Sequence, residues 1–386
     1  MKNTPLWLSL VGLASMAWSL PTQAATAVTS EYTSKPAYYR YTETIRLQNS
    51  SSTAVVNLAI HVILLPPSTP YSQVDLVRLT PKPSRTIHDR NGNTIGIFNL
   101  ARMAPGTTRR ITLRYSATSH AIAYRLPQAV ARYHVHSALY RLYTSPKFEF
   151  RQGVNTDAPP LKALVKRVTR GITNPVLRAK ALFSWEVDHI RYRQAGQAAG
   201  SAVATLRRRS GICSDFAELY AALLRTDHIP ARLIGGYVTN NGGGQAGFHE
   251  WDEFYVPEVG WVVADPTWGR FGYFARLQDN WHVPLFGGIV PDVEVAYASR
   301  KASASLTVTP TYRFTQQSIQ IPSPTSVARP ILPVVLPKNT ATVHRLATTR
   351  RWWQRLLNDL KGLIRRIFLR SERLCLRCHP GGRAYG

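Results

Sequence analysis

The sequence predicts an α+β protein: an N-terminal antiparallel β-sandwich, then a core in which helices pack on an antiparallel sheet. Three observations support this prediction. Alternating runs of β-branched and aromatic residues fill residues 27–130, apolar residues take up helical spacing after residue 156, and strand-like segments return after Pro230. At 386 residues the chain is long enough for about two domains.

Residues 1–26 are predicted to be an export signal. Lys2 supplies a positive charge, the apolar run LWLSLVGLASMAWSL follows, and small residues stand near Ala24 to Ala27. The alternative, a retained membrane anchor, is less favoured because the apolar run is short for a membrane span. No other segment is apolar enough to cross a bilayer. We therefore expect an exported protein, periplasmic or secreted, for which a peripheral position at a membrane is one alternative.

The composition is strongly basic. Lys and Arg number 48 against 21 Asp and Glu, which gives a formal net charge of +27 at pH 7. Such a charge favours anionic surroundings, namely lipid headgroups, cell-wall polymers or nucleic acid. Export favours the first two, so no nucleic-acid partner is expected.

Residues 27–130 are predicted to form the β-sandwich. The segments YYRYTETIRLQN, AVVNLAIHVILLPP, RTIHDRNGNTIGIFNL and RRITLRYSATS alternate, and Asn91-Gly92 is a tight-turn pair. Residues 131–155 form a polar and aromatic connector.

The core is predicted over residues 156–320. Asn174 caps a helix with Pro175 at its first position, and a second helix follows Cys213 and ends before Pro230. Three strand-like segments come next: ARLIGGYVT, FHEWDEFYV and, after the turn PEVG, WVVAD.

Beyond the core we expect a proline-rich linker at 321–343, a basic amphipathic helix at 344–372 and a tail at 373–386. The helix has the pattern of one that lies on an anionic membrane or docks into a groove; packing on its own core is equally compatible. In the tail, CLRCH has the spacing of c-type haem attachment. A local disulfide, a shared metal site or no function is favoured there, and no cofactor is predicted.

Cys213 is the candidate nucleophile. A thiolate attacks carbonyls whereas a thiol does not, and a helix N-terminus favours negative charge. Cys375 and Cys378 are close enough to pair with each other, which would leave Cys213 as the free thiol. The competing interpretation is a small buried core residue.

A thiolate also requires a base and a group that orients the base. His249 and Asp265 lie on the two strands of the predicted hairpin. A loop of three or five residues places both side chains on one face as diagonal neighbours, whereas a loop of four does not unless a bulge intervenes. The sequence leaves these alternatives open.

The blocks GICSDFAELYAALLR, IPARLIGGYV and HEWDEFYVPEVGWVVADPTWG resemble the core of the transglutaminase-like superfamily over residues 174–275. The resemblance implies a papain-like fold with Cys213 as nucleophile, His249 as general base and acid, and Asp265 as orienting carboxylate. The family commonly has glycine where this chain has Asp227-His228. Trp251 and Trp268 either shape the cleft or are core aromatics.

The resemblance further implies acyl transfer through a thioester on peptide, protein or cell-wall amides, with no metal required. We expect a cysteine peptidase or amidase; cross-linking by a transglutaminase is the alternative, and a non-catalytic envelope-binding protein is the alternative from another class. The Cys213 backbone N–H is the expected oxyanion donor, whereas the second donor is unassigned, with Gln194 and Gln197 nearby.

Overall fold

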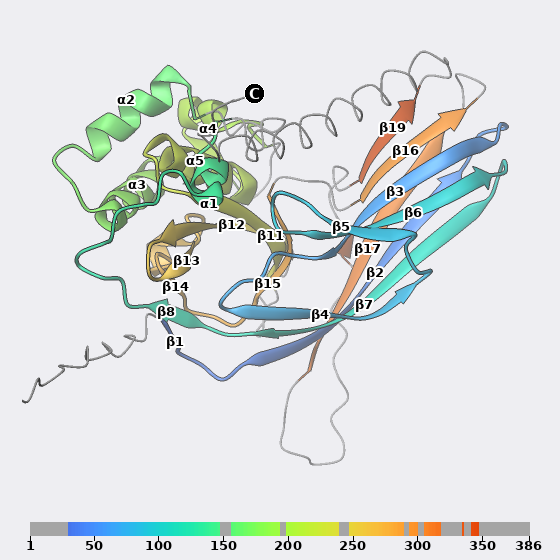
Figure 1. Cartoon of the computed structure of the whole chain (residues 1–386), viewed down its shortest axis with the longest axis horizontal. Helices are drawn as coiled ribbons and strands as arrows, with labels where there is room; N and C mark the ends of the chain where they lie inside the picture. The colour runs from blue at the N-terminus through green and yellow to red at the C-terminus, as the bar shows by residue number, and fades with distance from the viewer. Residues whose placement is uncertain are drawn as a thin grey trace, which may run out of the picture.

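The structure, a computed structural model, describes residues 30–146, 156–193, 198–238, 247–288, 293–299, 305–317, 334–335 and 341–346. Helices and a four-stranded sheet occupy one end of the molecule, and two long sheets form the other end (Figure 1). The predicted fold class, an antiparallel sandwich joined to a helix-on-sheet core, is confirmed. The predicted export signal, the helix beyond residue 346 and the CLRCH tail lie outside the described residues. Among these residues, no helix has the length and apolar character that a membrane span needs.

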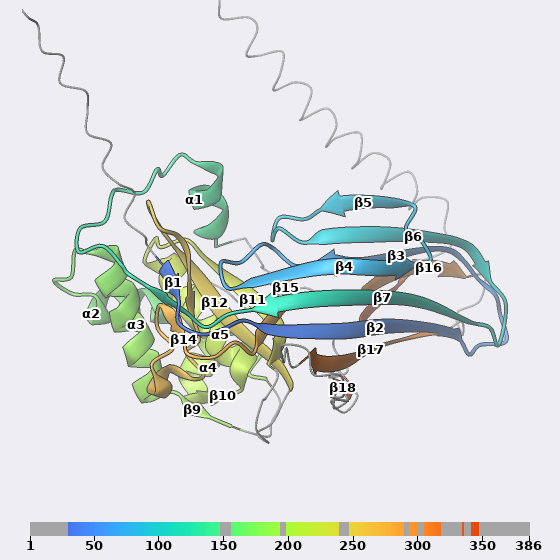
Figure 2. The ribbon, with the colours of Figure 1, turned by 90° about the horizontal axis from the view of Figure 1, so that it is seen from below.

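The sandwich consists of two five-stranded sheets, seen from below in Figure 2. One has the order β19-β16-β3-β6-β5, with bounds Ala341–Leu346, Val293–Ser299, Val55–Leu65, Thr94–Met103 and Arg85–His88. The other has the order β18-β17-β2-β7-β4, with bounds Val334–Val335, Leu306–Gln317, Ala37–Asn49, Thr108–Ser119 and Ser72–Thr80. Along β2 buried and accessible side chains alternate, because successive residues of a strand point to opposite faces. The apolar faces of the two sheets therefore share one core.

The sandwich is completed by strands that follow the core in the sequence, which corrects the predicted boundaries. Strands β16 and β17 fall inside the span 156–320 that was assigned to the core, and β18 and β19 fall in the predicted linker and at the start of the predicted helix. Strand β17 pairs with β2 from Leu306 opposite Asn49 to Gln317 opposite Tyr38. A sequence pattern predicts local structure only. It could not show that β17 pairs with β2, because the two strands are more than 250 residues apart in the chain.

The core has five helices among the described residues: α1 Ala138–Tyr143, α2 Pro159–Val168, α3 Pro175–His189, α4 Ala202–Arg208 and α5 Cys213–Thr226. Helix α5 packs on a sheet of order β13-β12-β11-β15, with bounds Gly260–Ala264, Gly247–Val256, Ala231–Val238 and His282–Gly287, and α2, α3 and α4 pack on α5. Asn174 caps α3 as predicted, because its side-chain oxygen accepts from the backbone N–H groups of Val176 and Leu177. Helix α5 is buried along most of its length and lies against β11 and β12.

Short elements complete the core. A three-stranded sheet joins β1 (Ser30–Tyr32), β8 (Ile122–Tyr124) and β14 (Arg276–Leu277). The strands β9 (Arg191–Tyr192) and β10 (Ser210–Gly211) pair in parallel, and the 3₁₀ helix η2 spans Gly269–Phe271.

The conformation of the turn after α5 explains why the family commonly has glycine where this chain has Asp227-His228. His228 has φ of 60°, in the left-handed region that glycine adopts most easily. Asp227 beside it forms an ion pair with Arg178 of α3. The substitution therefore strains one residue of the turn, at a position remote from the predicted triad.

The sandwich and the core are joined through β15. Its Val283, Leu285 and Phe286 belong to the sandwich core, although the strand pairs with β11. The Asn93 side chain exchanges two hydrogen bonds with the Gly287 backbone, at 2.7 and 2.9 Å. The sandwich therefore holds β15, the edge strand of the core sheet, in place.

Candidate active site

Cys213 is the first residue of α5, with Ile212 as the N-cap. Asp215 holds this helix start, because its carboxylate accepts from the backbone N–H of Ile212 at 2.9 Å and from that of Ala199 at 2.6 Å. Gly211 is required here because a Cβ at this position would overlap the Asp215 side chain. The Gly-x-Cys-x-Asp pattern thus builds the turn that presents Cys213 at a positively polarised helix end.

The loop that faces Cys213 is fixed by backbone pairing. Arg191 and Arg193 donate their backbone N–H groups to the carbonyls of Arg209 and Gly211, at 3.0 and 2.8 Å. Arg209 has φ of 54° and ends α4 at that point. Tyr192, between the two donors, is half exposed beside Cys213, and the charge of Cys213 contributes to a raised pKa of Tyr192 after the larger effect of burial.

His249 and Asp265 lie on one face of the hairpin. The connection from β12 to β13 is the three-residue loop 257–259, with Val256 opposite Gly260 and Asp252 opposite Ala264. This register makes His249 and Asp265 diagonal neighbours, which is the first of the predicted alternatives. The His249 Nε2 and the Asp265 Oδ2 are 2.8 Å apart and both side chains are buried. The other ring nitrogen of His249 is therefore available for Cys213, which contributes to the raised pKa of His249.

The interactions around His249 and Asp265 favour the protonated form of the histidine and the ionised form of the aspartate. Burial alone would lower the pKa of His249, but the charge and hydrogen bond of Asp265 and the contact with Cys213 raise it to about 10. Burial alone would raise the pKa of Asp265, but His249 and His282 hold it well below its ordinary value. An imidazolium at His249 and a carboxylate at Asp265 consequently coexist at neutral pH.

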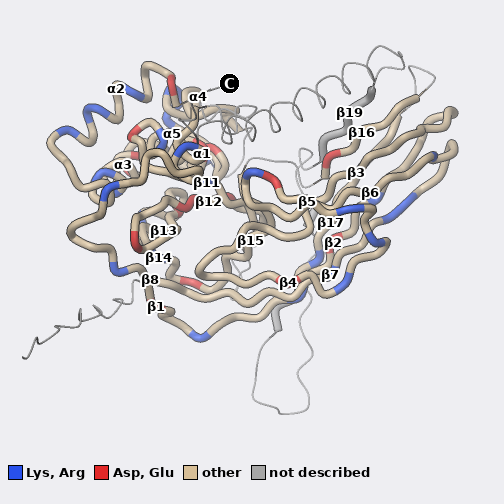
Figure 3. The backbone as a smooth tube through the Cα atoms, in the orientation of Figure 1, with Lys and Arg blue, Asp and Glu red and all other residues tan. Residues whose placement is uncertain are grey.

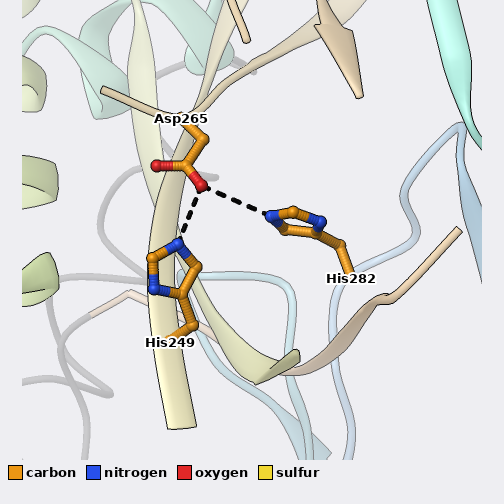
Figure 4. A group of neighbouring side chains, drawn as sticks. All are labelled: His249, Asp265 and His282. Carbon is orange, nitrogen blue, oxygen red and sulfur yellow. Dashed lines mark hydrogen bonds and ion pairs between the residues drawn. The ribbon is translucent and has the colours of Figure 1, made fainter. Parts of the chain in front are cut away.

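A fourth residue, His282, belongs to the site and was missed in the sequence. Figure 4 shows Asp265 between two imidazoles, with Oδ2 directed to both. The His282 Nε2 lies 3.4 Å from that oxygen, and its Nδ1 lies 2.9 Å from Asp279 Oδ1. His282 is fully buried, and its backbone carbonyl accepts from the Ser119 hydroxyl of the sandwich at 2.9 Å. Asp279 and His282 stand three residues apart, which is too common a spacing to indicate a site in a sequence.

Two carboxylates around one ring specify the protonation of His282. Each ring nitrogen faces a carboxylate oxygen, an arrangement that favours a proton on both nitrogens. Burial opposes this charge, but Asp279 and Asp265 raise the pKa of His282. Tyr273 donates its hydroxyl to the other oxygen of Asp279 at 2.6 Å. Charges of alternating sign therefore run from Asp279 through His282, Asp265 and His249.

The oxygen and nitrogen atoms of His249, Asp265 and His282 lie within 4.8 Å of one another, a grouping that also occurs around metals. Two ligands of a tetrahedral zinc ion are roughly 3.3 Å apart, given metal–ligand distances of about 2.0–2.1 Å. The 2.8 Å between His249 and Asp265 is shorter and matches a charge-assisted hydrogen bond. The geometry at Asp265 therefore favours a hydrogen-bonded proton between its carboxylate and His249 over a shared metal ion.

A cleft of about 710 Å³ opens beside His249. Its walls are mostly apolar, with two arginines: Val187, Ile190, Tyr192, Phe216, Val238, Phe248, Trp268, Phe271, Arg191 and Arg270. The Trp268 ring stacks on His249 with centroids 5.1 Å apart, so this tryptophan shapes the cleft. Trp251 is fully buried and donates to the Tyr71 hydroxyl at 2.7 Å, so it is a core aromatic. Gln194 and Gln197 lie outside the described residues.

Residues 162–266 match the family model of the transglutaminase-like superfamily, a span that contains Cys213, His249 and Asp265. Among curated proteins, the chain is 40% identical over 68 residues to a protein-glutamine gamma-glutamyltransferase of Pseudomonas aeruginosa. It is 36% identical over 78 residues to the uncharacterized protein YebA of Bacillus subtilis. Each alignment covers 16% of this chain and 10% of the relative, so the likeness concerns one domain.

A solved structure from Cytophaga hutchinsonii, provisionally named a cysteine protease, resembles this fold with a TM-score of 0.52. It is 18% identical, and the match covers 76% of this chain and 94% of that chain. The likeness therefore extends over sandwich and core together. It concerns the fold, whereas the domain match identifies residues 162–266 as a transglutaminase-like core.

His282 is expected to position Asp265, and this can be tested by replacing it with glutamine. Loss of a charge-assisted hydrogen bond of about 1.5–3 kcal/mol corresponds to a roughly 10- to 100-fold lower kcat. Asp279→Asn should lower kcat in the same direction because it removes the charge that keeps His282 protonated. The measurement is kcat against pH, since a purely structural role would lower the melting temperature without moving the profile. Unchanged kcat and pH profile in both variants would contradict the role.

Proposed function

We propose that the transglutaminase-like core makes this chain an exported thiol-dependent acyl-transfer enzyme acting on peptide, protein or cell-wall amides. The observation that carries the proposal is the arrangement of Cys213, His249 and Asp265, with a helix N-terminus under the thiol and a buried carboxylate behind the imidazole. A binding module needs none of these groups. The non-catalytic alternative is correspondingly less favoured.

In the proposed reaction the Cys213 thiolate attacks the amide carbonyl carbon. The carbonyl oxygen becomes an oxyanion, for which the Cys213 backbone N–H at the first position of α5 is a donor. Protonated His249 gives its proton to the departing nitrogen, the carbon–nitrogen bond breaks, and a thioester and a free amine result. Neutral His249 then takes a proton from the acceptor, whose oxygen or nitrogen displaces the thiolate. Asp265 keeps the ring oriented throughout.

Hydrolysis is the favoured outcome, with water as the acceptor and a cysteine peptidase or amidase as the result. Transfer to a lysine amine is the second candidate, because one curated relative is named a protein-glutamine gamma-glutamyltransferase. The two outcomes share the thioester and differ only in the acceptor. Incubation of a glutamine-containing peptide with and without a fluorescent primary amine separates them, since only transfer gives a labelled peptide.

The apolar walls and two arginines of the cleft define the proposed substrate. Phe216, Trp268 and Phe271 provide contact area for an apolar side chain, while Arg191 and Arg270 are available to a carboxylate. An acyl donor with an apolar residue and an acidic group near the scissile amide fits this lining best.

The proposal is tested first by the alkylation rate of Cys213 against pH, in the wild type and in His249→Ala. A positive charge on His249 and the positively polarised N-terminus of α5 would both stabilise a negative charge on the sulfur. Iodoacetamide labelling of Cys213, followed by mass spectrometry, should therefore persist well below pH ~8.5, where ordinary thiols react slowly. His249→Ala should lose this low-pH reactivity. Identical profiles in the two proteins would reject an activated thiol.

A further inference from the structure

The outer face of the sheet β17-β2-β7-β4 carries an ordered array of arginine and threonine. The inner face of these strands packs into the sandwich core through residues such as Tyr41, Ile45 and Leu113, so the alternate residues point outward. Figure 2 shows the four strands side by side, and blue segments far outnumber red ones along the sandwich in Figure 3. None of the residues that line the cleft beside His249 lies on these four strands.

The strand register arranges the outward residues in three rows that cross the strands. The first row consists of Arg313, Thr42, Arg114 and Arg78. The second consists of Thr311, Thr44, Thr112 and Thr80, and the third of Thr309, Arg46 and Arg110. Every outward position in these rows is therefore Arg or Thr, and all the arginines are exposed.

The spacing of the rows follows from strand geometry. Four residues along a strand separate the two arginine rows by roughly 14 Å. Three strand spacings make the first two rows about 14 Å long, and two spacings make the third about 10 Å long. Threonine is shorter than arginine, so the side chains of the central row are shorter than the arginines of the rows on either side. The Thr311 hydroxyl donates to the Thr44 carbonyl at 3.2 Å and keeps its acceptor sites.

This arrangement acts against the stability of the sheet. Arg46 lies directly opposite Arg110, and Arg78 lies directly opposite Arg114. Like charges in such positions destabilise a sheet. Among the described residues, no ion pair includes any of these arginines. Asp75 on β4, the acidic group at the margin, is engaged by Gln73. The unbalanced positive charge favours an external anion.

We propose that this face binds a linear anionic polysaccharide lying along the threonine row, across the strands. Guanidinium groups on both sides would bind its sulfate, phosphate or carboxylate groups, and the threonine hydroxyls would bind sugar hydroxyls. Nucleic acid fits less well, because bases stack on aromatic side chains and these rows have none. A bilayer fits less well too, because interfacial binding relies on apolar side chains.

The test uses the purified full chain and dextran sulfate, with uncharged dextran as the reference, and measures Kd by calorimetry over a series of salt concentrations. The test variant replaces Arg46, Arg110, Arg114 and Arg313 with serine. The matched control replaces the same number of exposed arginines elsewhere, Arg85, Arg102, Arg132 and Arg167, and so has the same net charge. We expect a roughly 30-fold or greater loss of affinity in the test variant and under 3-fold in the control. The salt dependence should weaken only in the test variant.

A second variant, Thr44→Val with Thr112→Val, removes hydroxyl groups and preserves charge and β-branching. It should weaken binding of dextran sulfate several-fold and leave binding of phosphatidylglycerol vesicles unchanged. The melting temperature of the arginine variant should not fall, because facing like charges are removed. Equal losses in test and control variants would overturn the proposal. So would a test variant that loses vesicle or single-stranded DNA binding while it still binds dextran sulfate.

Discussion

Replacing Cys213 by alanine is expected to abolish acyl transfer, with a loss in kcat on the order of 10⁶-fold. The reaction requires a covalent bond to sulfur, and Cys213 at the start of α5 is the only cysteine among the described residues. Because Cys213 is partly exposed and its side chain does not cap the helix, the fold should be retained. Release of p-nitrophenol from a p-nitrophenyl ester, together with the melting temperature, measures both properties.

Two further variants make the Cys213 result specific. Cys213→Ser keeps a hydroxyl at the same place but lacks a readily formed anion, so it should be nearly as inactive as the alanine variant. Cys375→Ser with Cys378→Ser removes the other thiols of the chain and should retain full activity. Activity of Cys213→Ala within tenfold of the wild type would contradict the proposed thioester.

The local parts of the site could be predicted from the sequence because each depends on a few neighbouring residues. The cap at Asn174 and the helix start at Cys213 follow from residue types, and the structure has both. For the hairpin, the sequence predicted two alternatives. An odd number of loop residues places His249 and Asp265 on the same face, whereas an even number does not. The three-residue loop 257–259 resolved the question in favour of His249 beside Asp265.

The parts that escaped prediction depend on contacts between distant segments. His282 reaches Asp265 because β15 pairs with β11 and because Ser119 of the sandwich holds the backbone of His282. Neither contact can be predicted from the spacing of apolar residues in the sequence. Strands β16 and β17 complete the sandwich for the same reason. The export signal, the basic helix beyond residue 346 and the CLRCH tail stay predictions, since they lie outside the described residues.

Asp265→Asn is expected to lower kcat by roughly 10³- to 10⁴-fold, because a carboxylate is the only group that suits its neighbours. Oδ2 accepts from His249 and His282, and Oδ1 accepts from the Trp268 backbone N–H at 3.3 Å. An asparagine must direct its NH₂ group at one of these donors. If the NH₂ faces His249, it favours the tautomer whose proton points at Cys213, and that ring can no longer accept a proton from the acceptor.

The same substitution should move the alkaline limb of the pH profile. Above about pH 10 the wild-type His249 loses the proton that the leaving amine needs, so activity falls there. Without the charge of Asp265 the pKa of His249 falls, the imidazolium is lost at lower pH, and the limb shifts downward. A change at Asp265 that acted only through folding would lower the melting temperature and leave the residual activity with its original profile. Residual kcat measured between pH 6 and 11, with Asp265→Glu as the variant that restores the charge, therefore separates orientation of His249 from support of the fold.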